Sequence, residues 1–179
     1  MRRFLSICLL MPGLVLLLAG CGRQDEVVVT PAACLLGPAV WTEALASLPE
    51  TGEGQPGRET PPVLLDGRTP ISDCLPAEQT AADQETVGMS VVEVATYLSA
   101  GRGSRGDGGS GGAGRQAEAR AARAGYLVGA LENGSRSSQG IHAALVGRVE
   151  SAATNRLGDG GEALRVSYER GREAGLELG

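Results

Sequence analysis

The chain has 179 residues and a formal net charge of −5, with one histidine, four cysteines and an aromatic content of only 3%. All sixteen basic residues are arginine, which excludes a Schiff-base lysine and the lysine of a P-loop. The acidic balance argues against a nucleic-acid partner, because nucleic acids require a basic protein face.

The first twenty residues have the pattern of a secretory signal. Arg2 and Arg3 precede an apolar run over residues 4–18, and small residues follow it. The run is barely long enough to cross a bilayer, and Pro12-Gly13 interrupts it. An ordinary cleaved signal and an uncleaved membrane helix are the alternatives to the interpretation that follows.

The end of this signal, Leu18-Ala19-Gly20-Cys21, resembles the lipobox of bacterial lipoproteins. The resemblance implies that the Cys21 thiol carries diacylglycerol, that residues 1–20 are removed, and that the new amino group is acylated, for example with palmitate. Two or three acyl chains hold a protein durably, since each buried methylene contributes about 0.8 kcal/mol and one chain binds only marginally. The resemblance therefore implies a lipid anchor in the cell membrane or outer membrane, facing outside the cytoplasm.

Removal of the signal leaves residues 21–179, with 14 arginines against 21 acidic residues and a net charge of −7. We expect residues 21–33 to be a lipidated, flexible tether and residues 34–179 to form one helical domain. Cys34 and Cys74 are its two cysteines, and an oxidising compartment favours a disulfide between them. Two free thiols and a metal pair are the alternatives, although the wide spacing and the single histidine make a zinc site a poor fit.

In the first part of the domain, the sequence predicts one short helix followed by one long loop. Pro38 suits the first turn of a helix, and Pro49 ends it. Its apolar face is Val40, Trp41, Leu45 and Leu48. Residues 49–73 are predicted to be a loop, because most of them are polar, glycine or proline. Residues 63–67 resemble half of a hairpin, but Pro70 weakens the second half, so irregular structure held by Cys74 is expected.

The next helix is predicted to begin after Thr80. Thr80 and Asp83 resemble a capping box with aspartate in place of glutamate. Apolar residues follow at helical spacing, namely Val87, Val91, Val94 and Leu98. The β-branched residues also suit a strand, and the length and the period favour a helix.

Residues 101–114 contain eight glycines and are predicted to be a flexible loop. Residues 101–106 match the G-x-G-x-x-G pattern, but neither a strand before it nor a helix within it is predicted, so no dinucleotide cofactor is expected. Residues 105–107 spell Arg-Gly-Asp, which looks like an integrin-binding tripeptide without any supporting context.

Three further helices are predicted after the glycine-rich segment. The first has an alanine-rich stripe and ends at Asn133-Gly134; the stripe is Ala117, Ala121, Ala124, Val128 and Leu131. Ser137 or Ser138 caps the second, whose inner face is Ile141, Leu145, Val149 and Ala152. The last follows residues 158–161 and carries Leu164, Tyr168, Gly171 and Gly175.

Small residues recur every fourth position on two of these helices. They are Ala121, Gly125 and Gly129 on one helix, and Gly171 and Gly175 on the other. This pattern permits close approach of two helix backbones. Because charged residues interrupt both segments, we expect close packing inside a bundle rather than in lipid.

Candidate catalytic groups do not assemble into a recognisable site in the sequence. His142, the only histidine, is interpreted as a capping or surface residue, since catalysis requires a nucleophile and an orienting acid beside it. Paired carboxylates serve glycoside hydrolysis, and the candidates are Asp83, Glu85, Glu93, Glu150, Glu162 and Glu169. They are interpreted mainly as solvated helix faces.

The sequence therefore predicts an all-α protein, a small disulfide-stapled bundle of about four to five helices with a flexible tether and a glycine-rich loop. The expected function is non-catalytic: a membrane-anchored envelope lipoprotein that binds an envelope protein or a small ligand, or acts structurally. No cofactor and no metal are expected. The alternative is an exported hydrolase of cell wall or glycan that uses helix-borne carboxylates.

Overall fold

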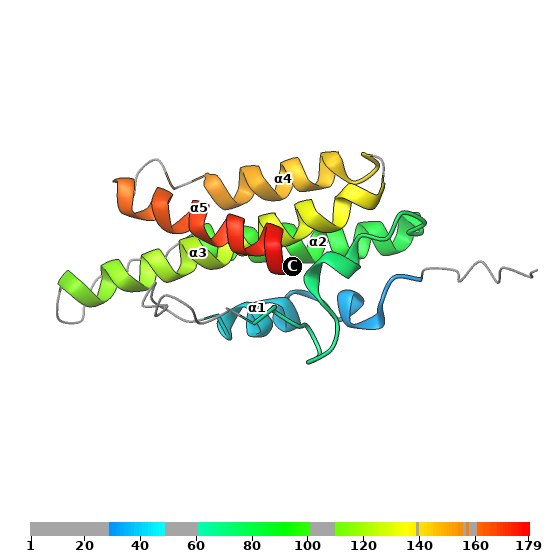
Figure 1. Ribbon diagram of the computed structural model, residues 1–179, viewed down its shortest axis with the longest axis horizontal. Helices are drawn as coiled ribbons and strands as arrows, with labels where there is room; N and C mark the ends of the chain where they lie inside the picture. The colour runs from blue at the N-terminus through cyan, green and yellow to red at the C-terminus, as the bar shows by residue number, and fades with distance from the viewer. Residues whose placement is uncertain (1–28, 49–60, 101–109, 139, 156, 158–160) are drawn as a thin grey trace, which may run out of the picture.

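The computed structural model describes residues 29–48, 61–100, 110–138, 140–155, 157 and 161–179. Within these ranges the chain forms five α-helices and three short 3-10 helices, and its one β-bridge joins Leu64 to Pro70. The α-helices are α1 (Pro38–Ala46), α2 (Ala81–Ser99), α3 (Ser110–Ser135), α4 (Ala143–Thr154) and α5 (Gly161–Leu178) (Figure 1). The all-α bundle predicted from the sequence is confirmed.

Several sequence predictions fall outside the described residues. They concern the signal peptide, Cys21 and the first part of the tether, residues 49–60 of the loop predicted over residues 49–73, the G-x-G-x-x-G pattern and the Arg-Gly-Asp tripeptide.

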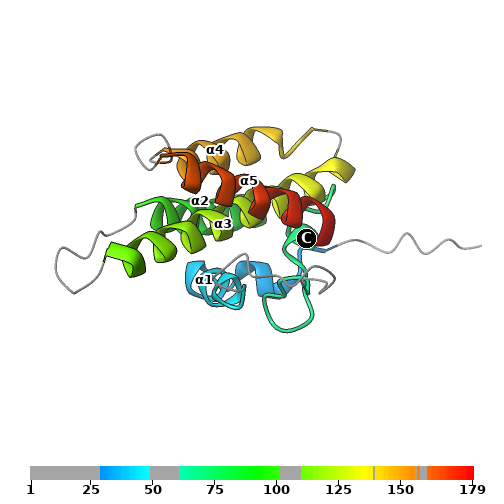
Figure 2. The ribbon, with the colours of Figure 1, turned by 60° about the vertical axis from the view of Figure 1, so that its left-hand side comes forward.

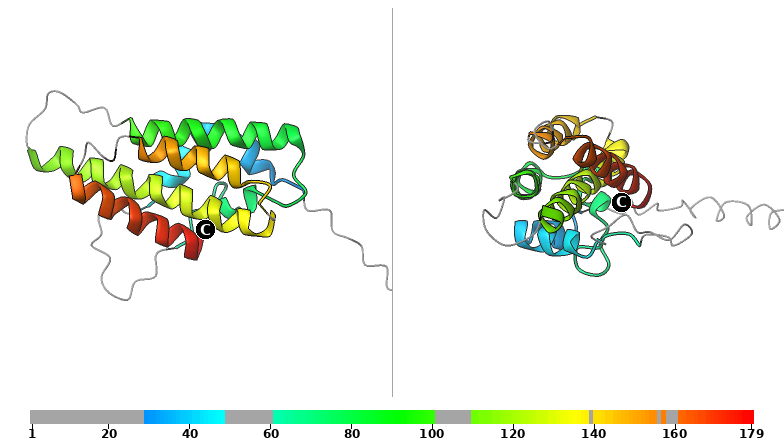
Figure 3. Two further views of the ribbon diagram at one scale, coloured as in Figure 1. Left: turned by 90° about the horizontal axis from the view of Figure 1, so that it is seen from above. Right: turned by 90° about the vertical axis from the view of Figure 1, so that its left-hand side faces the viewer.

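Helix α3 lies at the centre of the bundle, with the other four α-helices arranged around it (Figures 2 and 3). Every residue over the range 124–131 is buried, so this part of α3 is covered on all sides. The predicted stripe is confirmed for Ala121, Ala124, Val128 and Leu131, whereas Ala117 is half-buried.

Glycines bring α3 and α5 into backbone contact, as the small-residue pattern predicts. A Cβ atom on Gly125 would overlap the carbonyl oxygen of Tyr168, and one on Gly171 would overlap the carbonyl oxygen of Ala122. One turn further along each helix, a Cβ atom on Gly129 or on Gly175 would likewise overlap a backbone carbonyl oxygen of the opposite helix. At this separation the glycine Cα hydrogens face carbonyl oxygens of the opposite helix, a weak attraction that recurs at close helix interfaces.

An ion pair closes one side of the same interface. The guanidinium of Arg172 on α5 donates to both carboxylate oxygens of Glu132 on α3, over 3.1 and 3.0 Å. Both side chains are about one-third exposed, and the two-pronged geometry fixes the relative position of the helices. The sequence analysis did not predict this pair, because the partners are 40 residues apart.

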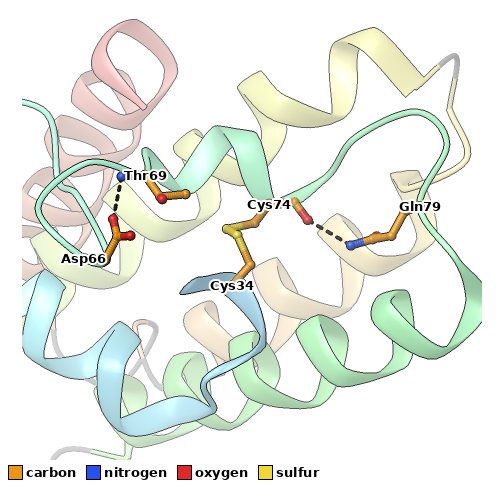
Figure 4. The surroundings of a disulfide bond; sticks show 5 residues. All are labelled: Cys34, Asp66, Thr69, Cys74 and Gln79. Carbon is orange, nitrogen blue, oxygen red and sulfur yellow. Dashed lines mark hydrogen bonds between the residues drawn. A yellow bond between two sulfur atoms is a disulfide. The ribbon is translucent and has the colours of Figure 1, made fainter. Parts of the chain in front are cut away.

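The disulfide between Cys34 and Cys74 is present, with the two Cα atoms 5.5 Å apart (Figure 4). It joins two 3-10 helices, η1 (Ala32–Leu35) and η2 (Ile71–Cys74), and both cysteines are fully buried. Thr30 and Ala33 are buried as well, so packing begins before the predicted end of the tether at residue 33.

Residues 61–70, which precede η2, turn sharply and are tied to the bundle by a backbone hydrogen bond. The Asp66 carboxylate accepts from the backbone N–H groups of Arg68 and Thr69, which closes a turn at Gly67, where φ is +77° (Figure 4). The backbone N–H of Val63 donates to the hydroxyl of Tyr126 on α3 over 3.0 Å. The predicted loop over residues 49–73 therefore ends earlier than expected, because η2 begins at Ile71.

Helix α2 begins and packs as predicted. The Thr80 hydroxyl accepts from the backbone N–H of Asp83 over 3.1 Å, which satisfies one free donor of the first turn. The predicted apolar stripe of four residues on α2 is buried.

The predicted boundaries of α3 are wrong at both ends. Its first described residues, Ser110 to Gly114, are helical rather than part of a flexible loop, and the helix ends at Ser135 instead of Asn133-Gly134. Gly134 lies within the helix, and the backbone of Ser72 passes so close that a Cβ atom there would overlap the Ser72 carbonyl oxygen.

The beginning of α4 also differs from the prediction. Ser137 and Ser138 lie in a 3-10 helix, η3 (Arg136–Ser138), and His142 is the first flanking residue of α4. Ile141 is 60% exposed, whereas Leu145 and Val149 are buried as predicted. Ile141 precedes the first residue of the helix, and Val146 and Ala153 complete the buried face, whereas the predicted Ala152 is half-buried.

Candidate functional site

The predicted interpretation of His142 as a capping or surface residue is wrong. The side chain is 1% exposed and makes no capping hydrogen bond. Its Nε2 lies 3.0 Å from the carbonyl oxygen of Pro76, and its Nδ1 lies 3.3 Å from the Nε2 amide nitrogen of Gln84. In this arrangement Nε2 donates to the Pro76 carbonyl oxygen, and the Gln84 amide nitrogen donates to Nδ1. His142 therefore joins the start of α4 to the segment between η2 and α2.

The candidate carboxylates are distributed over three helices. Glu85 and Glu93 are exposed on α2, and Glu162 and Glu169 are exposed on α5, while Asp83 and Glu150 are half-buried. Glu162 pairs with Arg165 one turn away, as an ordinary surface neighbour. Among the described residues, no group of three or more histidine, cysteine, aspartate or glutamate side chains is placed to hold a metal ion.

Tyr168 carries a buried hydroxyl at the centre of α5. The residue is 3% exposed, and its oxygen has no hydrogen-bond partner among the described residues. Burial, reinforced by the negative charge of Glu150, raises the pKa of Tyr168 to about 12. This hydroxyl is therefore neutral over the physiological range.

Replacing Tyr168 by phenylalanine is expected to leave stability at pH 8 unchanged or raise it by up to about 1 kcal/mol, because the removed oxygen has no partner. Between pH 10 and pH 12 the unfolded tyrosine ionises while the folded one does not, so the natural protein loses about 2 to 3 kcal/mol as the pH rises. Tyr168→Phe should lose less over this range. Urea unfolding followed by circular dichroism at pH 8 and pH 12 tests both expectations, and a loss above about 1 kcal/mol at pH 8 contradicts them.

A hollow of about 380 Å³ lies where the described chain begins. Val29 and Pro31 form one side, and the other lining residues are Ser72, Asp73, Leu75, Pro76, Asn133, Gly134 and Ser137. Asp73 is its one charged lining residue. The hollow has no aromatic lining residue and no basic one, so it offers little to grip an anionic or stacking ligand.

A larger groove of about 520 Å³ lies between α1 and α2. Its walls are mainly apolar, and Glu43 from α1 and Glu93 from α2 are its two charged lining residues. Tyr97 on α2 also lines the groove and is 63% exposed. The full lining is Pro38, Ala39, Thr42, Glu43, Ala46, Glu93, Val94 and Tyr97. This groove, called the α1–α2 groove below, is the best candidate binding surface.

Sequence reasoning found Glu93 but missed its neighbours in the groove. Tyr97 and Glu43 fall outside the apolar stripes of their helices, which was a usable signal for exposed positions. It did not reveal that the two helices bring these positions together, because pairing between α1 and α2 depends on the bundle arrangement.

None of the helices in the described ranges is both long enough and apolar enough to span a bilayer. The chain matches no family model, and no curated protein and no solved structure is similar to it.

Proposed function

We propose that this protein is a lipid-anchored component of a bacterial envelope whose helical domain acts as a non-catalytic binding module. The observation that carries the proposal is the lipobox-like Leu18-Ala19-Gly20-Cys21 directly after an apolar run. The Cys34–Cys74 disulfide supports it, because disulfides persist in compartments outside the cytoplasm.

The proposed anchor lies close to the folded domain along the chain. Only residues 22–28 separate Cys21 from Val29, where the described structure begins. A fully extended chain covers about 3.5 Å per residue, so the start of the domain lies within about 30 Å of the bilayer. A tether of this length keeps the domain concentrated near partners in the same membrane.

Binding fits the described surface better than catalysis. A glycosidase requires two carboxylates held about 5 to 9 Å apart, with the acid in an environment that raises its pKa. Glu43 and Glu93 share the α1–α2 groove, which is the one observation in favour of a hydrolase, but both side chains are exposed. An open groove with an exposed aromatic residue is more typical of a docking surface.

Replacing Cys21 by serine is expected to abolish acylation, because serine has no thiol to form the thioether. The natural protein should sediment with membranes and incorporate labelled palmitate, whereas Cys21→Ser should incorporate none and leave the tightly bound fraction. Cys8→Ser removes a thiol within the predicted signal and is the matched control, which should behave like the natural protein. Equal labelling of Cys21→Ser and the natural protein contradicts the lipid anchor.

A further inference from the structure

We propose that the α1–α2 groove binds a polypeptide segment of a partner protein that carries arginine or lysine beside apolar side chains. The inference rests on the binding role proposed above. It does not depend on the lipid anchor, since it concerns only the described surface.

The exposure of Tyr97 sets it apart from the other described aromatic residues. Trp41, Tyr126 and Tyr168 are all buried, at most 3% exposed, whereas Tyr97 is 63% exposed. Tyrosine is among the residues that dominate binding energy at protein interfaces, because it offers a large rigid surface with one polar end. In a protein with so few aromatic residues, an exposed one that lines a hollow of about 520 Å³ points to a contact surface.

Helix α2 extends this surface along its outer side. Met89, Glu93 and Tyr97 follow one another at intervals of four residues, so they lie on one face of the helix. Met89 is also 63% exposed. The face therefore presents an adaptable apolar side chain, a carboxylate and an aromatic ring in sequence.

The charge in the groove selects the chemistry of the partner. Glu43 and Glu93 come from opposite walls, and none of the described residues that line the groove is basic. A guanidinium or ammonium group from a partner would neutralise both walls, while the apolar walls accept the neighbouring side chains. An acidic segment or an anionic lipid headgroup would be repelled.

The polar groups also favour a partner that is rich in hydrogen-bond donors. The Thr42 hydroxyl donates to the Pro38 carbonyl oxygen over 2.9 Å, and ionised carboxylates only accept hydrogen bonds. The groove therefore offers mainly acceptors, which suits the donor-rich heads of arginine and lysine.

Site-specific photo-crosslinking in cells that produce the full chain tests the proposal. Benzoylphenylalanine is placed at Tyr97 or, as a control, at Val166, which is 41% exposed on α5. Figure 3 shows α2 and α5 on different sides of α3. After irradiation, the linked peptide is identified by mass spectrometry. Position 97 should give a protein adduct whose linked segment contains arginine or lysine next to apolar residues, and position 166 should not give this adduct.

Charge-reversal variants distinguish an effect of the groove carboxylates from an effect of the net charge of the protein. Glu43→Arg with Glu93→Arg should abolish the adduct at position 97. Glu173→Arg with Glu177→Arg makes the same change in net charge on exposed positions of α5 and should leave it intact.

Binding of the linked segment, made as a labelled synthetic peptide, is then measured by fluorescence anisotropy on the purified full chain in detergent. Tyr97→Ala should weaken binding at least 10-fold. The two groove reversals should weaken it and remove most of its dependence on salt.

Several outcomes would overturn the proposal: no adduct at position 97, an adduct to lipid, glycan, a second copy of this chain or an acidic segment, or an adduct that survives the groove reversals. Sedimentation of membranes from the same cells tests the lipid anchor independently of the groove. If the protein is acylated and sediments without a groove adduct, only the groove assignment fails. If the adduct forms on a protein that carries no lipid, only the anchor fails.

Discussion

Replacing Gly125 by alanine is expected to destabilise the folded domain by about 3 kcal/mol or more. The new methyl group would meet the Tyr168 carbonyl oxygen and the backbone nitrogen of Arg172, and backbone atoms cannot rotate away as a side chain can. Overpacking in a well-packed core typically costs about 1 to 3 kcal/mol, and relief here requires α5 to move away from α3. Such a movement also breaks the pair between Arg172 and Glu132.

The same substitution at Gly147 is the matched control. Gly147 lies in α4, is exposed, and a Cβ atom there would have no neighbour within 4 Å. Gly147→Ala should therefore stabilise the protein by about 0.5 to 1 kcal/mol through helix propensity alone.

Urea unfolding of the two variants, followed by circular dichroism, measures the difference. Gly171→Ala should behave like Gly125→Ala, because its methyl group would meet the Ala122 backbone from the other side of the interface. Similar midpoints for Gly125→Ala and Gly147→Ala would contradict backbone contact between α3 and α5.

Removing the disulfide is expected to produce an equally large loss. The bridge closes a segment of 40 residues, and the loop-entropy model gives a loss of about 4 kcal/mol when such a crosslink is removed. A typical domain is stable by only about 5 to 15 kcal/mol, so this is a substantial fraction. The variant with Cys34→Ser and Cys74→Ser also places two hydroxyls at fully buried positions, which adds a penalty for unpartnered polar groups.

Two comparisons separate these contributions. Cys34→Ala with Cys74→Ala removes the crosslink without introducing hydroxyls and should retain most of the loss. Denaturation with and without reductant should shift the midpoint of the natural protein but not that of either double variant. A natural protein whose midpoint ignores reductant would mean that the bridge contributes nothing to stability.

The helices were predictable because their apolar spacing and end signals are local. The period of α2 is visible in Val87, Val91, Val94 and Leu98, and Thr80 marks the beginning of the helix. Both features can be recognised without the rest of the chain. The disulfide was predictable for a similar reason, since only two cysteines remain after residue 21.

The failures concern features that depend on neighbouring helices. Gly134 is a typical helix-ending residue, yet it lies within α3, and glycine is required there because the Ser72 backbone occupies the space that a side chain would need. His142 seemed polar enough for the surface, yet Pro76 and Gln84 supply a partner to each ring nitrogen. Glycine and histidine have roles that only their surroundings decide, so single-sequence reasoning assigned the commonest role to each.

The candidate site was the least predictable part. Glu93 was recognised as a carboxylate on a helix surface, but the groove also requires Glu43 and Tyr97, which come from two helices more than thirty residues apart. The α1–α2 groove exists because both helices rest on the same central helix, and no local pattern encodes that relation.

The position of the sulfur bridge also has a mechanical consequence. Tension applied to the chain before Cys34 and resisted beyond Cys74 passes directly from one sulfur to the other. The intervening stretch, which includes α1, is bypassed by this load. If the molecule is held at its first residues, thermal motion of the domain would therefore load the covalent disulfide. Helix α1, which supplies one wall of the groove, lies outside this load path.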